Sequence, residues 1–181
     1  MNRIHSHGRR GFFKTVLAGM FASLASPLRH AHAIDERRLD FLHTHTGKRL
    51  DVTYKRNGEF VPEALHDINA FLQDFRTGER AEIDPELLDL IFDLREELGG
   101  KGTYEVISAY RSPKTNEMLR GRSSGVAKNS QHLLGKAIDV RLTGVELPKL
   151  RDTAIAMQRG GVGYYAKSNF IHVDTGRVRR W

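Results

Sequence analysis

Apolar residues take every second position in residues 137–142 and again in residues 170–174. This period of two predicts two β-strands, each with one buried face of branched apolar side chains. Asp139 lies on the opposite face of the first strand, and His172 and Asp174 share the opposite face of the second. If the two strands pair, Asp139 and His172 become cross-strand neighbours.

Similar patterns predict the other elements of the fold. Alternating stretches predict further strands over residues 34–47, 48–61, 103–110 and 162–165. Asn57-Gly58 supplies a hairpin turn signal. Apolar residues at helical spacing, with Pro near the start or Gly at the end, predict helices: residues 62–78, 85–98, 114–119 and 147–159. This order predicts an α+β fold, with a mainly antiparallel sheet flanked by helices in a single domain over residues 34–181.

Two histidines, His43 and His45, share one face of the first predicted strand. They are candidates for lining a cleft or holding a metal ion. Their spacing alone favours the exposed polar face of an edge strand, so we assign them no chemistry.

The net charge of +7 is concentrated at the start of the chain. Residues 1–33 contain five basic residues and no acidic one, and the remaining 24 basic and 22 acidic residues give only +2. This balance removes the main support for nucleic acid as a partner. The chain has no cysteine, which excludes disulfides, thiolate metal ligands and cysteine nucleophiles.

Residues 1–33 have the pattern of an export signal. The segment from Gly8 to Lys14 contains Arg9-Arg10 and resembles a twin-arginine signal, although Ser or Thr is common where Gly8 stands. The apolar run that follows is shorter than the ~20 residues that span a bilayer, which favours cleavage over an uncleaved anchor. We expect cleavage after Ala33, the twin-arginine export machinery as a partner, and a periplasmic domain with no membrane span after processing.

The candidate chemistry lies in Ser130-Gln131-His132-Leu133-Leu134-Gly135-Lys136-Ala137-Ile138-Asp139 and in the strand that carries His172. Singly, His132 has the setting of a surface histidine, Asp139 that of a solvated carboxylate, and His172 that of a core imidazole. Together they form a zinc ligand set of two imidazoles and one carboxylate that leaves a fourth position for water. Burial of these groups together requires compensating charge, so we expect one Zn²⁺ per chain on the sheet face.

The same motif, Ser-x-His-x-x-Gly-x-Ala-x-Asp followed by a later strand histidine, resembles the LAS-type zinc peptidases. These include the D-Ala-D-Ala carboxypeptidases, with hedgehog domains as relatives, and the murein endopeptidase K type is the most similar group. The resemblance implies a hedgehog-like fold, His132, Asp139 and His172 as zinc ligands, and peptidoglycan peptide stems as partners.

The resemblance also bears on two catalytic roles. Members of the family carry an arginine after the strand that ends near Ser108, and Arg111 matches it as the group that contacts substrate or stabilises the oxyanion. Many relatives place an acid three residues before the last histidine ligand, where this chain has Asn169. Asp174, on the same strand face as His172, is the remaining candidate base, with orientation of His172 as the alternative.

Two functions fit these residues. The first is a zinc-dependent murein endopeptidase that cuts meso-diaminopimelate-containing crosslinks of peptidoglycan, mainly the 3–3 type, during growth or remodelling of the cell wall. The second is a non-catalytic, zinc-stabilised module that binds wall peptides, which Asn169 keeps open because a neutral amide does not accept the proton of an attacking water.

Overall fold

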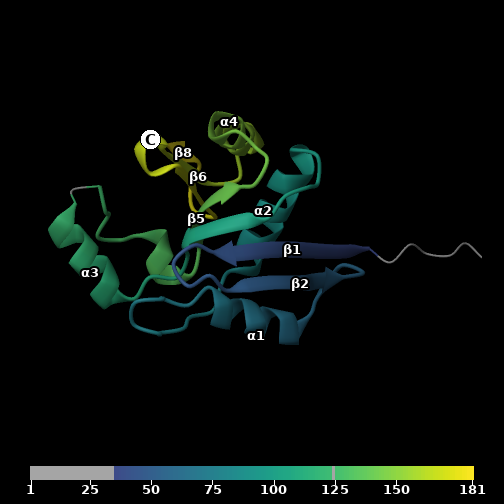
Figure 1. Cartoon of the computed structure of the whole chain (residues 1–181), viewed down its shortest axis with the longest axis horizontal. Helices are drawn as coiled ribbons and strands as arrows, with labels where there is room; N and C mark the ends of the chain where they lie inside the picture. Colours follow the sequence, from purple (N-terminus) through teal and green to yellow (C-terminus); the bar gives the residue numbers. More distant parts are fainter. Residues whose placement is uncertain (1–34, 124) are drawn as a thin grey trace, which may run out of the picture. The chain divides into compact units, whose positions relative to one another are not determined.

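The computed structural model describes residues 35–123 and 125–181, so the predicted export signal lies outside the described residues. Figure 1 shows strands and helices interleaved along the chain, as the sequence predicts for an α+β domain. The strands are β1 (Glu36–His43), β2 (Arg49–Arg56), β3 (Glu59–Phe60), β4 (Tyr104–Ser108), β5 (Ala137–Leu142), β6 (Gly161–Tyr165), β7 (Phe170–Asp174) and β8 (Arg179–Arg180). The α-helices are α1 (Pro62–Phe71), α2 (Pro85–Glu97), α3 (Pro113–Arg122) and α4 (Leu147–Met157), and the short 3₁₀ helices are η1 (Gln131–Leu134) and η2 (Ala166–Ser168).

The eight strands form one sheet in the order β3-β2-β1-β4-β5-β7-β6-β8. The pairs β1–β4 and β6–β8 are parallel, and the other neighbours are antiparallel, which confirms the mainly antiparallel sheet. The strands β5 and β7, which carry the candidate ligands, lie in the interior of this order and pair with each other.

The apolar face of β5 and β7 packs into the core shared with the helices. Ile138, Val140, Ile171 and Val173 are at most 1% exposed. Burial of one such side chain contributes roughly 1.5–3 kcal/mol, so the core holds both strands firmly. Because side chains alternate along a strand, Asp139 and His172 face away from the helix-packed core.

Two predicted helix lengths need correction. The helix α1 ends at Phe71 and not near Gly78, because the chain leaves it to place Asp74 in a loop. The carboxylate of Asp74 accepts hydrogen bonds from the backbone N–H of Arg76 and from the backbone N–H and hydroxyl of Ser112, which a helical course would prevent. The helix α3, expected over residues 114–119, is longer than its weak apolar pattern indicates.

The expectation for His43 and His45 was wrong in part. The strand β1 lies between β2 and β4 and is not an edge strand, and His43 is only 2% exposed. Its ring packs edge-on against Phe71 and Phe75, while His45 lies in the following turn and stacks on Phe75 at 4.3 Å between ring centroids. Both histidines therefore serve aromatic packing.

No helix among residues 35–123 and 125–181 is long and apolar enough to cross a membrane.

Candidate active site

The register of β5 and β7 sets the first two candidate ligands side by side. Asp139 pairs directly with His172 across the two strands, as the sequence predicts. The two side chains project from the sheet face opposite the helix-packed core and are 6% and 7% exposed.

His132 reaches the same point from η1. The hydroxyl of Ser130 caps this helix by accepting from the backbone N–H of His132 at 3.3 Å. Gly135 ends the helix in the left-handed region at a φ of 67°, and a Cβ there would collide with the carbonyl oxygen of Glu82. A cap and a glycine turn thus aim His132 at the sheet.

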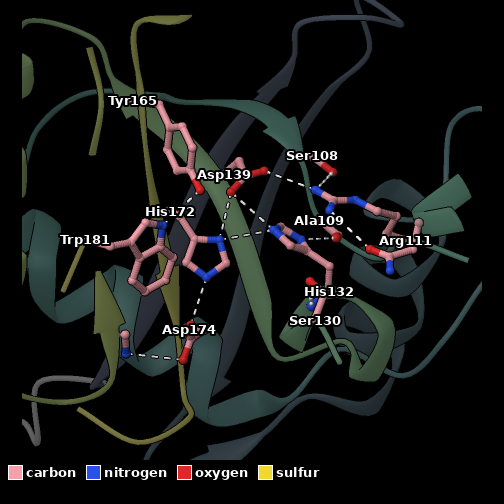
Figure 2. Close-up of polar contacts among 12 residues, drawn as sticks. Ser108, Ala109, Arg111, Ser130, His132, Asp139, Tyr165, His172, Asp174 and Trp181 are labelled. Atoms are coloured by element: carbon pink, nitrogen blue, oxygen red, sulfur yellow. Dashed lines mark hydrogen bonds and ion pairs between the residues drawn. The ribbon is translucent and has the colours of Figure 1, made fainter. Parts of the chain in front are cut away.

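Three side-chain atoms converge where these elements meet (Figure 2). Nε2 of His132 lies 3.1 Å from Nδ1 of His172 and 3.2 Å from Oδ1 of Asp139, and the latter two atoms are 2.9 Å apart. Tetrahedral ligands at roughly 2.0–2.2 Å from one ion lie about 3.3–3.6 Å from each other. The observed spacing is close to that of ligands sharing one ion.

The outer hydrogen bonds of the two rings fix which nitrogen faces this point. Nδ1 of His132 lies 2.6 Å from the carbonyl oxygen of Ala109, which only accepts, so Nδ1 carries the proton. Nε2 of His172 lies 2.8 Å from Oδ2 of Asp174 and donates to it. In their neutral forms, both rings therefore direct lone pairs at the same point as the Asp139 carboxylate, an arrangement that fits a cation.

The charges of the site support this conclusion. Burial opposes ionisation of Asp139, but His132 and His172 hold the pKa of its carboxyl well below the usual range. Burial lowers the pKa of His132. Burial also opposes charge on His172, yet hydrogen bonds with Asp139 and Asp174 raise its pKa. An ionised carboxylate in this setting is stabilised by positive charge between the two rings, which a metal ion supplies.

Asp174 does not occupy the position expected of a base. It lies at Nε2 of His172, while the nitrogen of that ring that faces the other two candidate ligands is Nδ1, and its side chain is fully buried. Its oxygens also accept from both terminal nitrogens of Arg179 and from the backbone N–H groups of Gly161 and Gly176. Although burial opposes ionisation, hydrogen bonds from His172, Arg179 and Gly176 lower the pKa of Asp174. The geometry matches the alternative role, in which Asp174 orients His172.

Arg111 lies beside the ligand atoms, as predicted. It is 8% exposed, and its contacts are long: 3.4 Å to Oδ2 of Asp139 and 3.5 Å to Ser108 and Asn116. Within the described part of the chain, its buried Nε has no hydrogen-bond partner. Burial lowers the pKa of Arg111, and Asp139 opposes that shift. The terminal nitrogens of this guanidinium thus make only weak contacts, which a bound group can replace.

Both Arg111 and the three ligand residues line one cavity of about 380 Å³. Residues 125–127 and 129, from the loop between α3 and η1, form another part of its wall. Among the residues that the structure describes, Asp139 is the only carboxylate residue on this wall.

The position of Asn169 has a conformational explanation. Asn169 ends η2 with a left-handed φ of 52°, a conformation that asparagine adopts more readily than most residues. It is exposed and is not part of the cavity wall. Its side chain therefore serves the turn before β7.

The sequence reasoning missed an aromatic wall made by Tyr165, Phe170 and Trp181. Trp181 is the single tryptophan of the chain, and its ring centroid lies 5.2 Å from that of His172. It follows β8, a strand of two residues that is too short to show any alternation. The rarity of tryptophan was the one available signal.

The family model described as "Peptidoglycan L,D-endopeptidase MepK" matches residues 31–181. The protein of that name from Escherichia coli is 39% identical over 161 residues, which cover 89% of this chain and 85% of the relative. The Haemophilus influenzae protein named "Probable peptidoglycan L,D-endopeptidase MepK" is 44% identical over 146 residues, covering 80% and 78%.

The chain belongs to this peptidase family. Membership confirms the family resemblance noted in the ligand motif and makes the chain a peptidase. The matched segment includes every candidate ligand, Arg111 and the aromatic wall.

Proposed function

We propose that this chain is a zinc-dependent murein endopeptidase that hydrolyses meso-diaminopimelate-containing crosslinks of peptidoglycan, mainly of the 3–3 type. The observation that carries the proposal is the convergence of three lone-pair-bearing atoms beside a buried arginine with unused donors. The names of the relatives supply the substrate class, since both describe L,D-endopeptidases of peptidoglycan.

In this proposal Nε2 of His132, Oδ1 of Asp139 and Nδ1 of His172 hold the zinc ion. When bound, zinc lowers the pKa of a water molecule to about 7 and polarises a carbonyl group. The protein residues hold the ligand atoms in place on the wall of the cavity. The hydrogen bond from His132 to Ala109 fixes one ring, and the bond from His172 to Asp174 fixes the other.

Arg111 faces the negative charge that develops on the carbonyl oxygen during hydrolysis. The weak contacts to Ser108, Asn116 and Asp139 hold its guanidinium without using its hydrogen-bonding capacity. Charge-assisted donors aimed at an oxyanion contribute strongly to catalysis in an enclosed site.

Asp174 acts as a positioning residue in this proposal. Arg179 holds its carboxylate with contacts of 3.0 and 2.6 Å, and the carboxylate in turn accepts from His172. This chain of contacts keeps the lone pair of Nδ1 directed at the point where the three candidate ligand atoms converge.

Export completes the proposal. The basic segment with Arg9-Arg10 supports transport by the twin-arginine route and a periplasmic location, where peptidoglycan is accessible. Replacement of Arg9-Arg10 by Lys-Lys is expected to leave an unprocessed precursor, detected by immunoblotting of cell fractions. Export of the double variant through the general secretion route would contradict this route.

One observation favours the second candidate, a non-catalytic module that binds wall peptides. Asp139 is the only carboxylate residue on the described cavity wall and already serves as a ligand, so a separate carboxylate base is lacking there. Turnover decides between the two candidates, because a binding module retains wall peptides without cutting them.

The test is digestion of purified peptidoglycan by the zinc-loaded protein, followed by mass spectrometry of the muropeptides. The expected result is loss of 3–3 crosslinked dimers, abolished by a chelator and restored by added zinc. The variant His66→Ala, which removes an exposed histidine remote from the ligands, serves as the control and should cleave normally. Full zinc content without loss of any crosslinked dimer would favour the binding module.

A further inference from the structure

Tyr165 and Trp181 form a hydrogen-bonded pair on the wall of the cavity. The indole Nε1–H of Trp181 donates to the hydroxyl oxygen of Tyr165 at 2.9 Å. Figure 2 shows the phenol directed from β6 toward the side of the cavity where His172 and Asp139 lie.

The backbone fixes the indole in this place. The backbone N–H of Trp181 donates to the carbonyl of Val162 at 3.2 Å, and its carbonyl accepts from Tyr164 at 3.0 Å. The ring lies over Gly163, where a Cβ would approach the indole to 2.7–2.9 Å. Gly163 therefore permits the close approach that brings Trp181 beside His172.

The phenol is held from the other side as well. Its ring stacks on Phe170 with centroids 4.7 Å apart and an angle of 19° between the planes. Stacking and the indole hydrogen bond together restrict Tyr165 to one orientation on the cavity wall.

The direction of the hydrogen bond determines what Tyr165 offers to a ligand. An indole N–H only donates, so the phenol oxygen accepts and its own proton is free for another acceptor. No other hydrogen bond of this hydroxyl occurs among the described residues. A neutral O–H donor therefore faces the cavity that also contains the Arg111 guanidinium.

We propose that Tyr165 is a catalytic residue whose hydroxyl donates a hydrogen bond to the scissile carbonyl oxygen as that oxygen becomes an oxyanion. Trp181 is a positioning residue that acts through Tyr165. This inference rests on the proposed hydrolytic function. A hydroxide, formed when water at the site loses a proton to bulk solvent, adds to the carbonyl carbon, and the π electrons of the carbonyl move to its oxygen. Tyr165 stabilises that charge without transferring its proton. When this adduct collapses, the C–N bond breaks and the amine leaves with a proton returned from solvent.

Two single variants and their combination test the pair. Tyr165→Phe keeps the ring and its stacking on Phe170 but removes the donor, and Trp181→Phe keeps an aromatic wall but removes the indole N–H. Removal of one oxyanion donor typically lowers kcat by about 10²–10³-fold. For Tyr165→Phe we expect a loss of that size in kcat with little change in KM, measured on a synthetic 3–3 crosslinked muropeptide dimer.

The pairing gives a stricter expectation. Trp181→Phe should lower kcat by roughly 10-fold, less than loss of the donor itself. The double variant should have the same kcat as Tyr165→Phe alone, because Trp181 acts through the hydroxyl that this variant already lacks. Independent, multiplying losses would contradict the positioning role of Trp181.

A readout other than turnover separates this role from a structural one. A phosphinate isostere of the scissile amide mimics the tetrahedral oxyanion, and its binding should weaken in parallel with kcat in the Tyr165→Phe variant. Zinc content should remain one per chain. The matched control is Tyr164→Phe, because the ring of Tyr164 lies next to Arg151 at 4.5 Å and not on the cavity wall.

The outcomes distinguish this inference from the function on which it rests. If the Tyr165→Phe variant cleaves the dimer as fast as the parent protein, the role of Tyr165 is overturned and the peptidase function stands. Lowered zinc content in Tyr165→Phe, or an equal loss in Tyr164→Phe, also overturns it. A parent protein that cleaves no crosslinked peptide overturns both.

Discussion

On the β7 side of the cavity, the oxygens of Asp174 accept from His172, Arg179 and two backbone N–H groups. On the β4 side, Arg111 has only long contacts of 3.4–3.5 Å, and its Nε has no partner within the described residues. Both are buried charged residues near the same three ligand atoms. In the proposed function, the group whose acceptors are all used positions its neighbour, and the group with weak contacts keeps donors for a substrate.

The largest expected effect comes from removal of the ligand set that both sides share. In the proposed function, Asp139→Ala leaves the two imidazoles without the carboxylate that would help to hold a cation between them. We expect no measurable cleavage of crosslinked muropeptides and a strong loss of bound zinc. Mass spectrometry of metal content and a digestion assay check this together, and full zinc content in this variant would remove Asp139 from the ligands.

The Arg111 side should respond in rate and not in metal binding. Arg111→Lys keeps the charge but loses the planar donor fork, so we expect kcat to fall by about 10²-fold with unchanged zinc content. Steady-state kinetics on a crosslinked dimer provides the measurement. A wild-type rate would show that the unused donors of Arg111 have no role in the reaction.

The Asp174 side should respond in metal binding and not in rate. Asp174→Asn weakens the hold on the His172 ring, so we expect metal affinity to fall by roughly 10–100-fold and activity to recover in excess zinc. Titration of the apoprotein with zinc, in parallel with activity, distinguishes the two sides. A rate loss that excess zinc does not restore would instead support Asp174 as a base.

The smallest expected effect concerns Asp74, whose carboxylate accepts two hydrogen bonds from Ser112, the residue after Arg111. Burial opposes ionisation of Asp74, but hydrogen bonds from Thr115, Ser112 and Arg76 lower its pKa to about 2. Since its ordinary pKa is near 3.9, Asp74 stabilises the fold by about 2 kcal/mol above that pH, and the contribution is lost as the pH falls toward 2.

The variant Asp74→Asn tests this contribution. It should lower the free energy of unfolding at pH 7 by that amount, with a smaller difference from the parent below pH 3. Urea denaturation at several pH values provides the measurement. A difference that stays constant across this range would show that ionisation of Asp74 is not the cause.

Strand periodicity was the strongest source of correct predictions. The alternation in residues 137–142 and 170–174 predicts both the pairing of β5 with β7 and the contact between Asp139 and His172, because side-chain direction in a strand follows from spacing alone. The structure adds that a serine cap and a glycine turn, both local features, set the position of His132.

What the sequence left undetermined depends on contacts between distant segments. Asp174 and His172 share a strand face, but which ring nitrogen meets the carboxylate is decided by Arg179 and the neighbouring turn. The interior place of β1 depends on its parallel pairing with β4, about 60 residues later, which left His43 buried. Spacing within one segment does not report such pairings.

The interior position of β5 has a consequence for how the ligand set opens. β5 is paired with β4 on one edge and β7 on the other, so its amide hydrogens exchange with solvent only when much of the sheet separates. η1, which carries His132, is a single turn that can open alone at far lower cost. An ion held by both joins that turn to the cooperative unit of the sheet, and its binding free energy then adds to the stability of the whole domain.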